Sequence, residues 1–86
     1  MVVAPNPATL EAHVRYTITR AGFVRILVSD VRGGRVKQVD SSLKRAGAHD
    51  SVWDGTDRYG RRVKSGIYFV RLEAEGRELK RTVVFR

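Results

Sequence analysis

The sequence has 86 residues, of which 42% are hydrophobic, and no cysteine, so it can build one modest core but neither disulfide bonds nor cysteine-ligated zinc. The formal net charge is +8, from 17 basic and nine acidic residues, a balance that suits an anionic partner such as acidic glycan, lipid head groups or nucleic acid. No apolar run approaches the roughly 18 residues of a transmembrane segment.

The chain is predicted to open with an extended segment and an amphipathic strand. Residues 1–8 are expected to be a linker-like lead-in, because Pro5 and Pro7 bias the residues before them toward extended conformations. From Leu10 to Ile18, apolar and polar residues alternate strictly. This period of two predicts a half-buried strand with Leu10 on its inner face.

The middle of the chain is predicted to form a hairpin and then a crossover between sheets. Phe23 to Val31 alternates as a strand whose Leu27 faces outward. Residues 30–36 follow as a turn, because paired glycines permit the positive φ angles of tight hairpins. The segment from Asp40 to Gly47 is polar, so we expect it to leave the sheet. Ala48 to Trp53 then forms the next strand.

Closely spaced turns separate the last strands. Residues 54–66 carry three turn signals between two apolar runs, which is typical of a tightly cornered β-protein. Ile67 to Ala74 is the strongest predicted strand, and Leu79 to Arg86 is the last. About seven short strands, spaced about 8 to 12 residues apart, predict one all-β domain over residues 1–86, built as a two-sheet antiparallel sandwich.

The turn region supplies the residues that we expect to fix the fold. Trp53 and Tyr68 have inward parity and are predicted to fill the core. Asp54 and Asp57 are predicted to accept backbone N–H bonds in Asx turns. Glycines and one serine complete the turns. The predicted structural set is Trp53, Asp54, Gly55, Asp57, Gly60, Ser65, Gly66 and Tyr68.

The same residues are weak candidates for chemistry. Asp54 and Asp57 lack the longer ligand series of a calcium loop and have arginines as neighbours. His13 and His49 lie on different predicted strands with no third metal ligand. No serine stands in a Gly-x-Ser-x-Gly motif. We therefore expect a non-enzymatic module with no cofactor and no metal.

A contact surface is predicted around the last two strands. Phe69 has outward parity, and with Ile67 and Leu27 it would either form an exposed apolar patch or lie under the crossover segment. The pattern leaves these two arrangements open. Basic residues of the same strands extend the predicted surface, which comprises Phe69, Arg71, Arg81 and Arg86.

Several motifs resemble one known family. They are Pro5-Asn6-Pro7, Gly22-Phe23-Val24, Ala46-Gly47-x-His49, and the block from Trp53-Asp54-Gly55 to Ser65-Gly66-Ile67-Tyr68. This pattern resembles the Ig-like domain family that includes the C-terminal module of the flagellar hook-capping protein. The family also includes the type A C-terminal sorting domains of the type IX secretion system. The resemblance implies an Ig-like, fibronectin-type β-sandwich.

Two departures from the family pattern are visible. Sorting domains usually continue after the second proline with Phe-Asn-Pro, whereas this chain reads Ala8-Thr9-Leu10. That difference favours the wider Ig-like family over the sorting branch. The second departure is Ser51, which stands where the family usually has a hydrophobic residue between His49 and Trp53, and it indicates local repacking only.

The resemblance implies a C-terminal sorting or anchoring module of a larger secreted bacterial protein, recognised by an outer-membrane secretion apparatus. The alternative is a structural module of an extracellular assembly, a hook-cap relative or filament subunit, whose edge strands and Phe69 patch contact neighbouring subunits. A module that binds anionic glycan is less favoured, and nucleic acid least, because the basic residues are spread along the chain. The sorting and assembly readings both imply a secreted or cell-surface protein.

Overall fold

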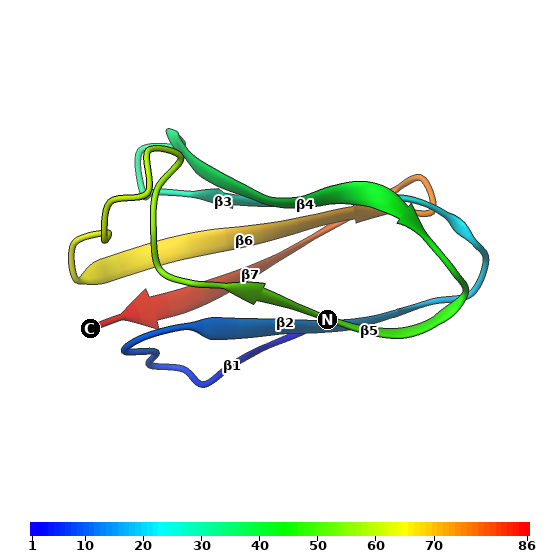
Figure 1. The fold of residues 1–86 in the computed structure, drawn as a ribbon, viewed down its shortest axis with the longest axis horizontal. Helices are drawn as coiled ribbons and strands as arrows, with labels where there is room; N and C mark the ends of the chain where they lie inside the picture. Colours follow the sequence, from blue (N-terminus) through cyan, green and yellow to red (C-terminus); the bar gives the residue numbers. More distant parts are fainter.

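Two antiparallel sheets pack face to face in the computed structural model, which describes all 86 residues (Figure 1). One sheet has the strand order β1-β2-β5, and the other has the order β4-β3-β6-β7. The strands are β1 (Val2–Ala4), β2 (Ala12–Ile18), β3 (Gly22–Ser29), β4 (Arg35–Lys44), β5 (Gly47–Trp53), β6 (Gly66–Ala74) and β7 (Arg77–Phe85). The predicted seven-stranded sandwich is confirmed. None of its elements is a helix that could cross a membrane.

The core is built from the inward positions of strands with period-two alternation. Fourteen buried residues form one cluster between the sheets. In β3 the inward residues Val24, Ile26 and Val28 are all fully buried, as predicted. Trp53 at the end of β5 is the largest side chain in the cluster and is 1% exposed. Burial of this apolar area is the main force that holds the two sheets together.

The lead-in is part of the sandwich, so the prediction of a linker over residues 1–8 is wrong. β1 pairs with β2, with Val3 opposite Val14. Ala8 is fully buried, and its N–H donates to the carbonyl of Val84 at 2.8 Å. The side chain of Asn6 accepts from the N–H of Val84 at 2.9 Å. Val84 lies far along the chain from Asn6 and Ala8, so no local sequence pattern predicts these contacts.

Two strand boundaries also differ from the sequence prediction. β2 begins at Ala12, and Leu10 is 74% exposed in the preceding loop rather than inward. Residues 40–44 stay in β4, and only residues 45 and 46 connect β4 to β5. Asp40 makes this polar strand end possible, because its carboxylate lies 2.9 Å from Lys44 Nζ and accepts from the Ser42 hydroxyl at 2.9 Å. The predicted crossover is therefore mostly strand.

Candidate functional site

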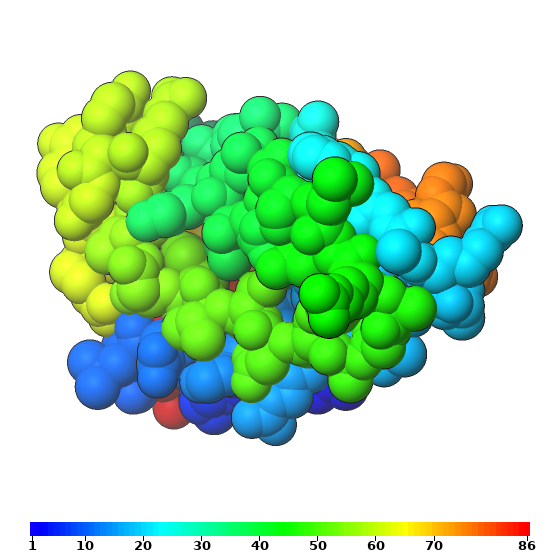
Figure 2. All heavy atoms as spheres, turned by 45° about the vertical axis from the view of Figure 1, so that its right-hand side comes forward, coloured from blue at the N-terminus to red at the C-terminus, as the bar shows by residue number.

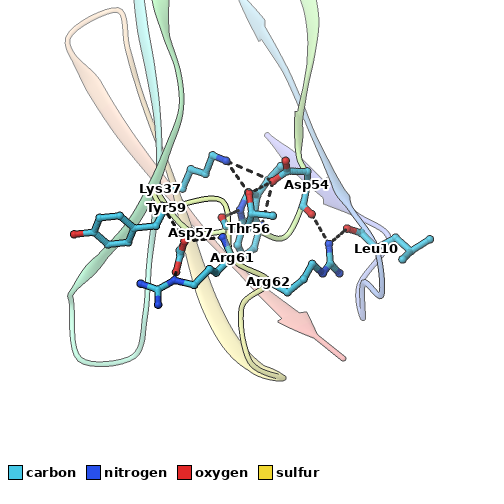
Figure 3. Close-up of polar contacts among 9 residues, drawn as sticks. Leu10, Lys37, Asp54, Thr56, Asp57, Tyr59, Arg61 and Arg62 are labelled. Carbon is cyan, nitrogen blue, oxygen red and sulfur yellow. Dashed lines mark hydrogen bonds and ion pairs between the residues drawn. The ribbon is translucent and has the colours of Figure 1, made fainter.

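The first turn after β5 is held by Asp54, as the sequence predicts. Its carboxylate accepts from the backbone N–H of Thr56 at 3.1 Å and also from the Thr56 hydroxyl. Lys37 Nζ lies 3.6 Å from the same carboxylate and donates to the Thr56 hydroxyl at 2.7 Å (Figure 3). The indole N–H of Trp53 donates to the Thr56 carbonyl at 2.9 Å. The turn is thereby anchored to the core tryptophan, which is the last residue of β5.

Gly55 has room for no side chain. Its φ is 73°, and a Cβ built there would stand 2.7 Å from Cζ of Phe85 and 3.0 Å from Nη1 of Arg62. Its carbonyl accepts from the N–H of Val63 at 2.9 Å. The aromatic ring of Phe85, at the end of β7, thus packs directly on the backbone of the turn. We call Gly55, Arg62 and Phe85, with the backbone that they touch, the Gly55 junction.

The second turn repeats one hydrogen-bond pattern used elsewhere in the domain. The Asp57 carboxylate accepts from the N–H groups of Tyr59 at 2.9 Å and Arg61 at 3.0 Å. Gly60, at φ 80°, donates to the Asp57 carbonyl at 3.0 Å. The β3–β4 turn is built in the same way, with Asp30 accepting from the N–H groups two and four residues later. An Asp-x-x-Gly sequence therefore makes both turns.

Arg62 is the functional residue of this region that the sequence does not reveal. Its guanidinium donates to the carbonyls of Leu10 at 3.1 Å and Asp54 at 2.6 Å (Figure 3). It also donates to the carbonyl of Thr9 at 3.0 Å. The same group lies 5.8 Å from the centre of the Phe85 ring. Arg62 therefore ties the loop before β2 to the turn after β5. Bonds from a charged donor are stronger than neutral ones, and the planar fork suits several acceptors at once.

Three aromatic residues next to the turns, Trp53, Tyr68 and Phe85, are buried and do not line an open groove. The rings of Trp53 and Tyr68 lie 5.4 Å apart at 67°, and those of Trp53 and Phe85 lie 4.9 Å apart at 64°. The Tyr68 hydroxyl donates to the Lys64 carbonyl at 2.6 Å. Such edge-on pairs add to the stability gained from area burial.

The remaining predicted turn residues are less engaged. Gly66 begins β6 opposite Phe85. Ser65 is exposed, and its hydroxyl makes no hydrogen bond in the structure.

The carboxylates of the two turns have lowered pKa values. The hydroxyl of Thr56 hydrogen-bonds the Asp54 carboxylate and so lowers its pKa, and the N–H of Arg61 does the same for the pKa of Asp57. A general acid near neutral pH needs the opposite shift. The two histidines are also separately engaged: His13 with Asp50 at 3.0 Å, and His49 with the Arg45 carbonyl at 2.7 Å.

The predicted contact residues do not share one surface. Phe69 and Arg71 lie on the outer face of the four-stranded sheet, with Phe69 half-buried beneath Lys80, whose Nζ is 5.6 Å from the ring centre. Arg81 pairs with the buried Val70 and so points to the opposite side of β7. Arg86 follows the end of β7. Phe69 and Arg71 therefore share a face of the sheet that Arg81 does not share.

The predicted apolar patch is only partly exposed. Leu27 has outward parity but is 3% exposed, and Ile67 is 47% exposed. Phe69 lies under Lys80 rather than under the crossover segment, which decides against the second of the two arrangements left open by the sequence.

A matched pair of glycine substitutions tests the Gly55 junction. Gly55→Ala is expected to lower the free energy of unfolding by about 3 kcal/mol or more, because it adds a clash with Phe85 to a left-handed penalty of about 1–2 kcal/mol. Gly60→Ala has a similar φ but open space around it, so it should cost only that penalty. Urea denaturation measures both, and equal losses would contradict the packing of Phe85 on Gly55.

Acidification should remove the contribution of Asp57. Because the folded-state pKa is lowered, the stabilisation is complete above the pKa of an unfolded aspartate, about 3.9, and is lost as the pH falls through the lower folded value. The stability difference between the wild type and Asp57→Asn should therefore be present near pH 7 and vanish in strong acid. Urea midpoints across this range test it. Glu78→Gln, at a side chain without a polar partner, is the control, and a constant Asp57 difference would contradict the assignment.

A comparison with known protein families gives a match that covers most of the residues just described. The model of the FlgD Ig-like domain matches residues 8–78, which include both Asp turns and the Gly55 junction except Phe85. A comparison with curated proteins finds no match. Neither the family model nor the solved structures below bears on type IX sorting, secretion-apparatus recognition or glycan binding, so those hypotheses have no support from them.

Two solved structures of FlgD are similar to this chain. FlgD from Xanthomonas campestris, described in connection with hook capping essential for flagellar assembly, is 32% identical, with a TM-score of 0.68 over 95% of this chain. The match covers 62% of that FlgD chain, so this chain spans less than two thirds of it. FlgD from P. aeruginosa is 17% identical, with a TM-score of 0.64 over 95% of this chain and 69% of its own, and supports the fold alone. The chain belongs to the FlgD Ig-like domain family.

Proposed function

We propose that this domain is a structural module of an extracellular bacterial assembly of the hook-capping type, where it makes contacts with neighbouring subunits. The observation that carries the proposal is the 32% identity, over 95% of this chain, to a FlgD studied for its role in hook capping. Because the match covers 62% of that protein, we further propose that residues 1–86 form one module of a larger exported protein.

The Gly55 junction suits a module that must keep its shape. The polar groups of the junction and of the two turns beside it form hydrogen bonds inside the domain. Asp54 and Asp57 accept from turn amides, and Arg62 donates to three carbonyls. Loops held in this way present neighbouring side chains in fixed positions, which lowers the entropy that is lost when a partner binds. The junction thus supports recognition without taking part in chemistry.

Exposed apolar side chains on the outer face favour a contact there. Phe23 on β3 and Leu43 on β4 stand directly opposite each other, and they are 54% and 78% exposed. On the edge strand β7, by contrast, the residues from Arg77 to Arg81 are all exposed, and all but Leu79 are charged. These charges discourage edge-to-edge pairing with another chain. We therefore place one subunit contact on the Phe23–Leu43 pair. Arg81, on the other side of β7, would serve a different contact.

Self-association measurements test this role. Light scattering of residues 1–86 should show a mass that rises with concentration, and the double substitution Phe23→Glu/Leu43→Glu should keep the domain monomeric. Val52→Glu is the control, because Val52 is 43% exposed on the other sheet and should leave the association unchanged. A strict monomer at millimolar concentration would count against subunit contacts through this face.

A further inference from the structure

A basic groove lies on the outer face of the four-stranded sheet. It has a volume of about 500 Å³, which is in the size range of small-molecule binding pockets. Four of its lining side chains are cationic, and none of the lining residues is acidic. The lining residues used in the argument are Arg35, Arg58, Arg71, Lys80, Leu27 and Ser29.

Strand register brings these separated residues together. Leu27 on β3 is paired with Arg71 on β6, which is paired in turn with Lys80 on β7. Two residues further along β3, on the same face, Ser29 is paired with Arg35 of β4. A turn adds the last cation, because the N–H of Arg58 donates to the Val36 carbonyl at 2.9 Å and so fixes the 54–63 segment against β4.

Most of this positive charge is not neutralised within the domain. Arg71 is paired with Glu73, at 3.1 Å between Nε and Oε2. Arg35, Arg58 and Lys80 make no ion pair. Like charges gathered in one groove repel one another, and an anionic ligand relieves that repulsion. The arginine forks are suited to carboxylates, which they bind with two parallel hydrogen bonds.

The floor of the groove disfavours nucleic acid. Leu27 is 3% exposed, and the ring of Phe69, on the neighbouring strand, is covered by Lys80 at 5.6 Å. Single-stranded nucleic acids need exposed aromatic faces on which bases stack. The groove presents cations around a floor without an exposed aromatic ring. This arrangement suits a short cluster of carboxylates better than a long phosphate backbone.

The acidic ligand must come from a different chain. Of the nine acidic residues, Glu78 makes neither a hydrogen bond nor an ion pair inside the domain, and Glu11 only approaches the His13 ring, at 3.6 Å. The engaged carboxylates include Asp30 in the β3–β4 turn and Glu75, which accepts from the N–H groups of Thr19 and Arg20. A second copy, with its own net charge of +8, therefore has little to offer this groove.

Exposed apolar residues flank the cations. Tyr59 is 68% exposed beside Arg58, and Val31 is 64% exposed in the turn that contributes Gly33 to the groove. Figure 2 shows the segment around residues 57–65, in yellow-green, projecting at one end of the molecule. A mixture of tyrosine, arginine and aliphatic side chains is typical of protein interfaces.

We propose that this groove binds an acidic segment of a partner protein, whose clustered Asp or Glu carboxylates are held by Arg35, Arg58 and Lys80. The inference rests on the proposed structural role, because it names the chemistry of one partner of the module. A peptide titration tests the groove alone, whereas self-association tests contacts between copies, so either can fail without the other.

The test uses a peptide of about six glutamates, which spans about 20 Å when extended. Chemical shifts of the backbone amides are followed during titration, at an ionic strength of about 0.01 M and again at about 0.15 M, where the Debye length falls from about 30 Å to about 8 Å. We expect shifts centred on Leu27, Ser29 and Arg71. Arg35→Glu/Arg58→Glu should weaken binding by about tenfold or more at the lower ionic strength.

The matched control is Arg20→Glu/Arg45→Glu, which changes the net charge equally. Both residues are exposed and lie in the β2–β3 and β4–β5 connections, at the end of the sandwich opposite the 54–66 loop (Figure 1). An equal loss in this control, or no binding at the lower ionic strength, would overturn the proposal. So would a sulfated oligosaccharide or an oligonucleotide that occupies the same groove more than about tenfold tighter than the peptide, because the ligand would then be a glycan or nucleic acid.

Discussion

The structure depends on the contact between a phenylalanine ring and a glycine backbone. Phe85, at the end of β7, packs on Gly55 so closely that a Cβ on the glycine would stand 2.7 Å from the ring. The Phe85 ring also belongs to the core, because it packs edge-on against the Trp53 ring, with 4.9 Å between the ring centres. The last strand, the turn after β5 and the core tryptophan are therefore fixed together. A side chain at position 55 would force at least one of them to move.

The polar groups around the junction are engaged in hydrogen bonds within the domain. Arg62 links the loop before β2 to the turn, and Asp54 and Asp57 accept the turn amides. Buried or constrained backbone groups need such partners, because an unpaired donor or acceptor costs free energy. The same turns bring Arg58 over the outer face of the four-stranded sheet. A purely structural device thereby determines where the basic groove stands, and connects the fold to the proposed recognition of an acidic partner.

The sequence predicts the parts of this structure that depend on local chemistry. Strand alternation in β2, β3 and β6, and the Asx turns at Asp54 and Asp57, follow from the pattern of neighbouring residues. β1 escapes prediction because three residues are too few to show alternation, and its partner lies in β2.

Residues with long-range roles are also hidden from the sequence. Arg62 resembles the nearby Arg58 and Arg61 in every local respect, and only the folded loop before β2 distinguishes it. The polar segment that begins at Asp40 has the pattern of a crossover, because Lys44 and Ser42, which pair with the Asp40 carboxylate, are also polar. The basic groove draws on β3, β4, β6, β7 and a turn, and it becomes visible only when the strand register is known.

Hydrogen exchange of the turn amides tests the central claim that the contact between Phe85 and Gly55 fixes the turns after β5 to the sheets. The relevant N–H groups are those of Thr56, Tyr59 and Arg61, which donate to carboxylates, and of Val63, which donates to the Gly55 carbonyl. We expect these amides to exchange only through openings nearly as costly as those of the central strands β3 and β6. Rapid exchange of all four, while the strand amides stay protected, would show an independently mobile loop and contradict the account.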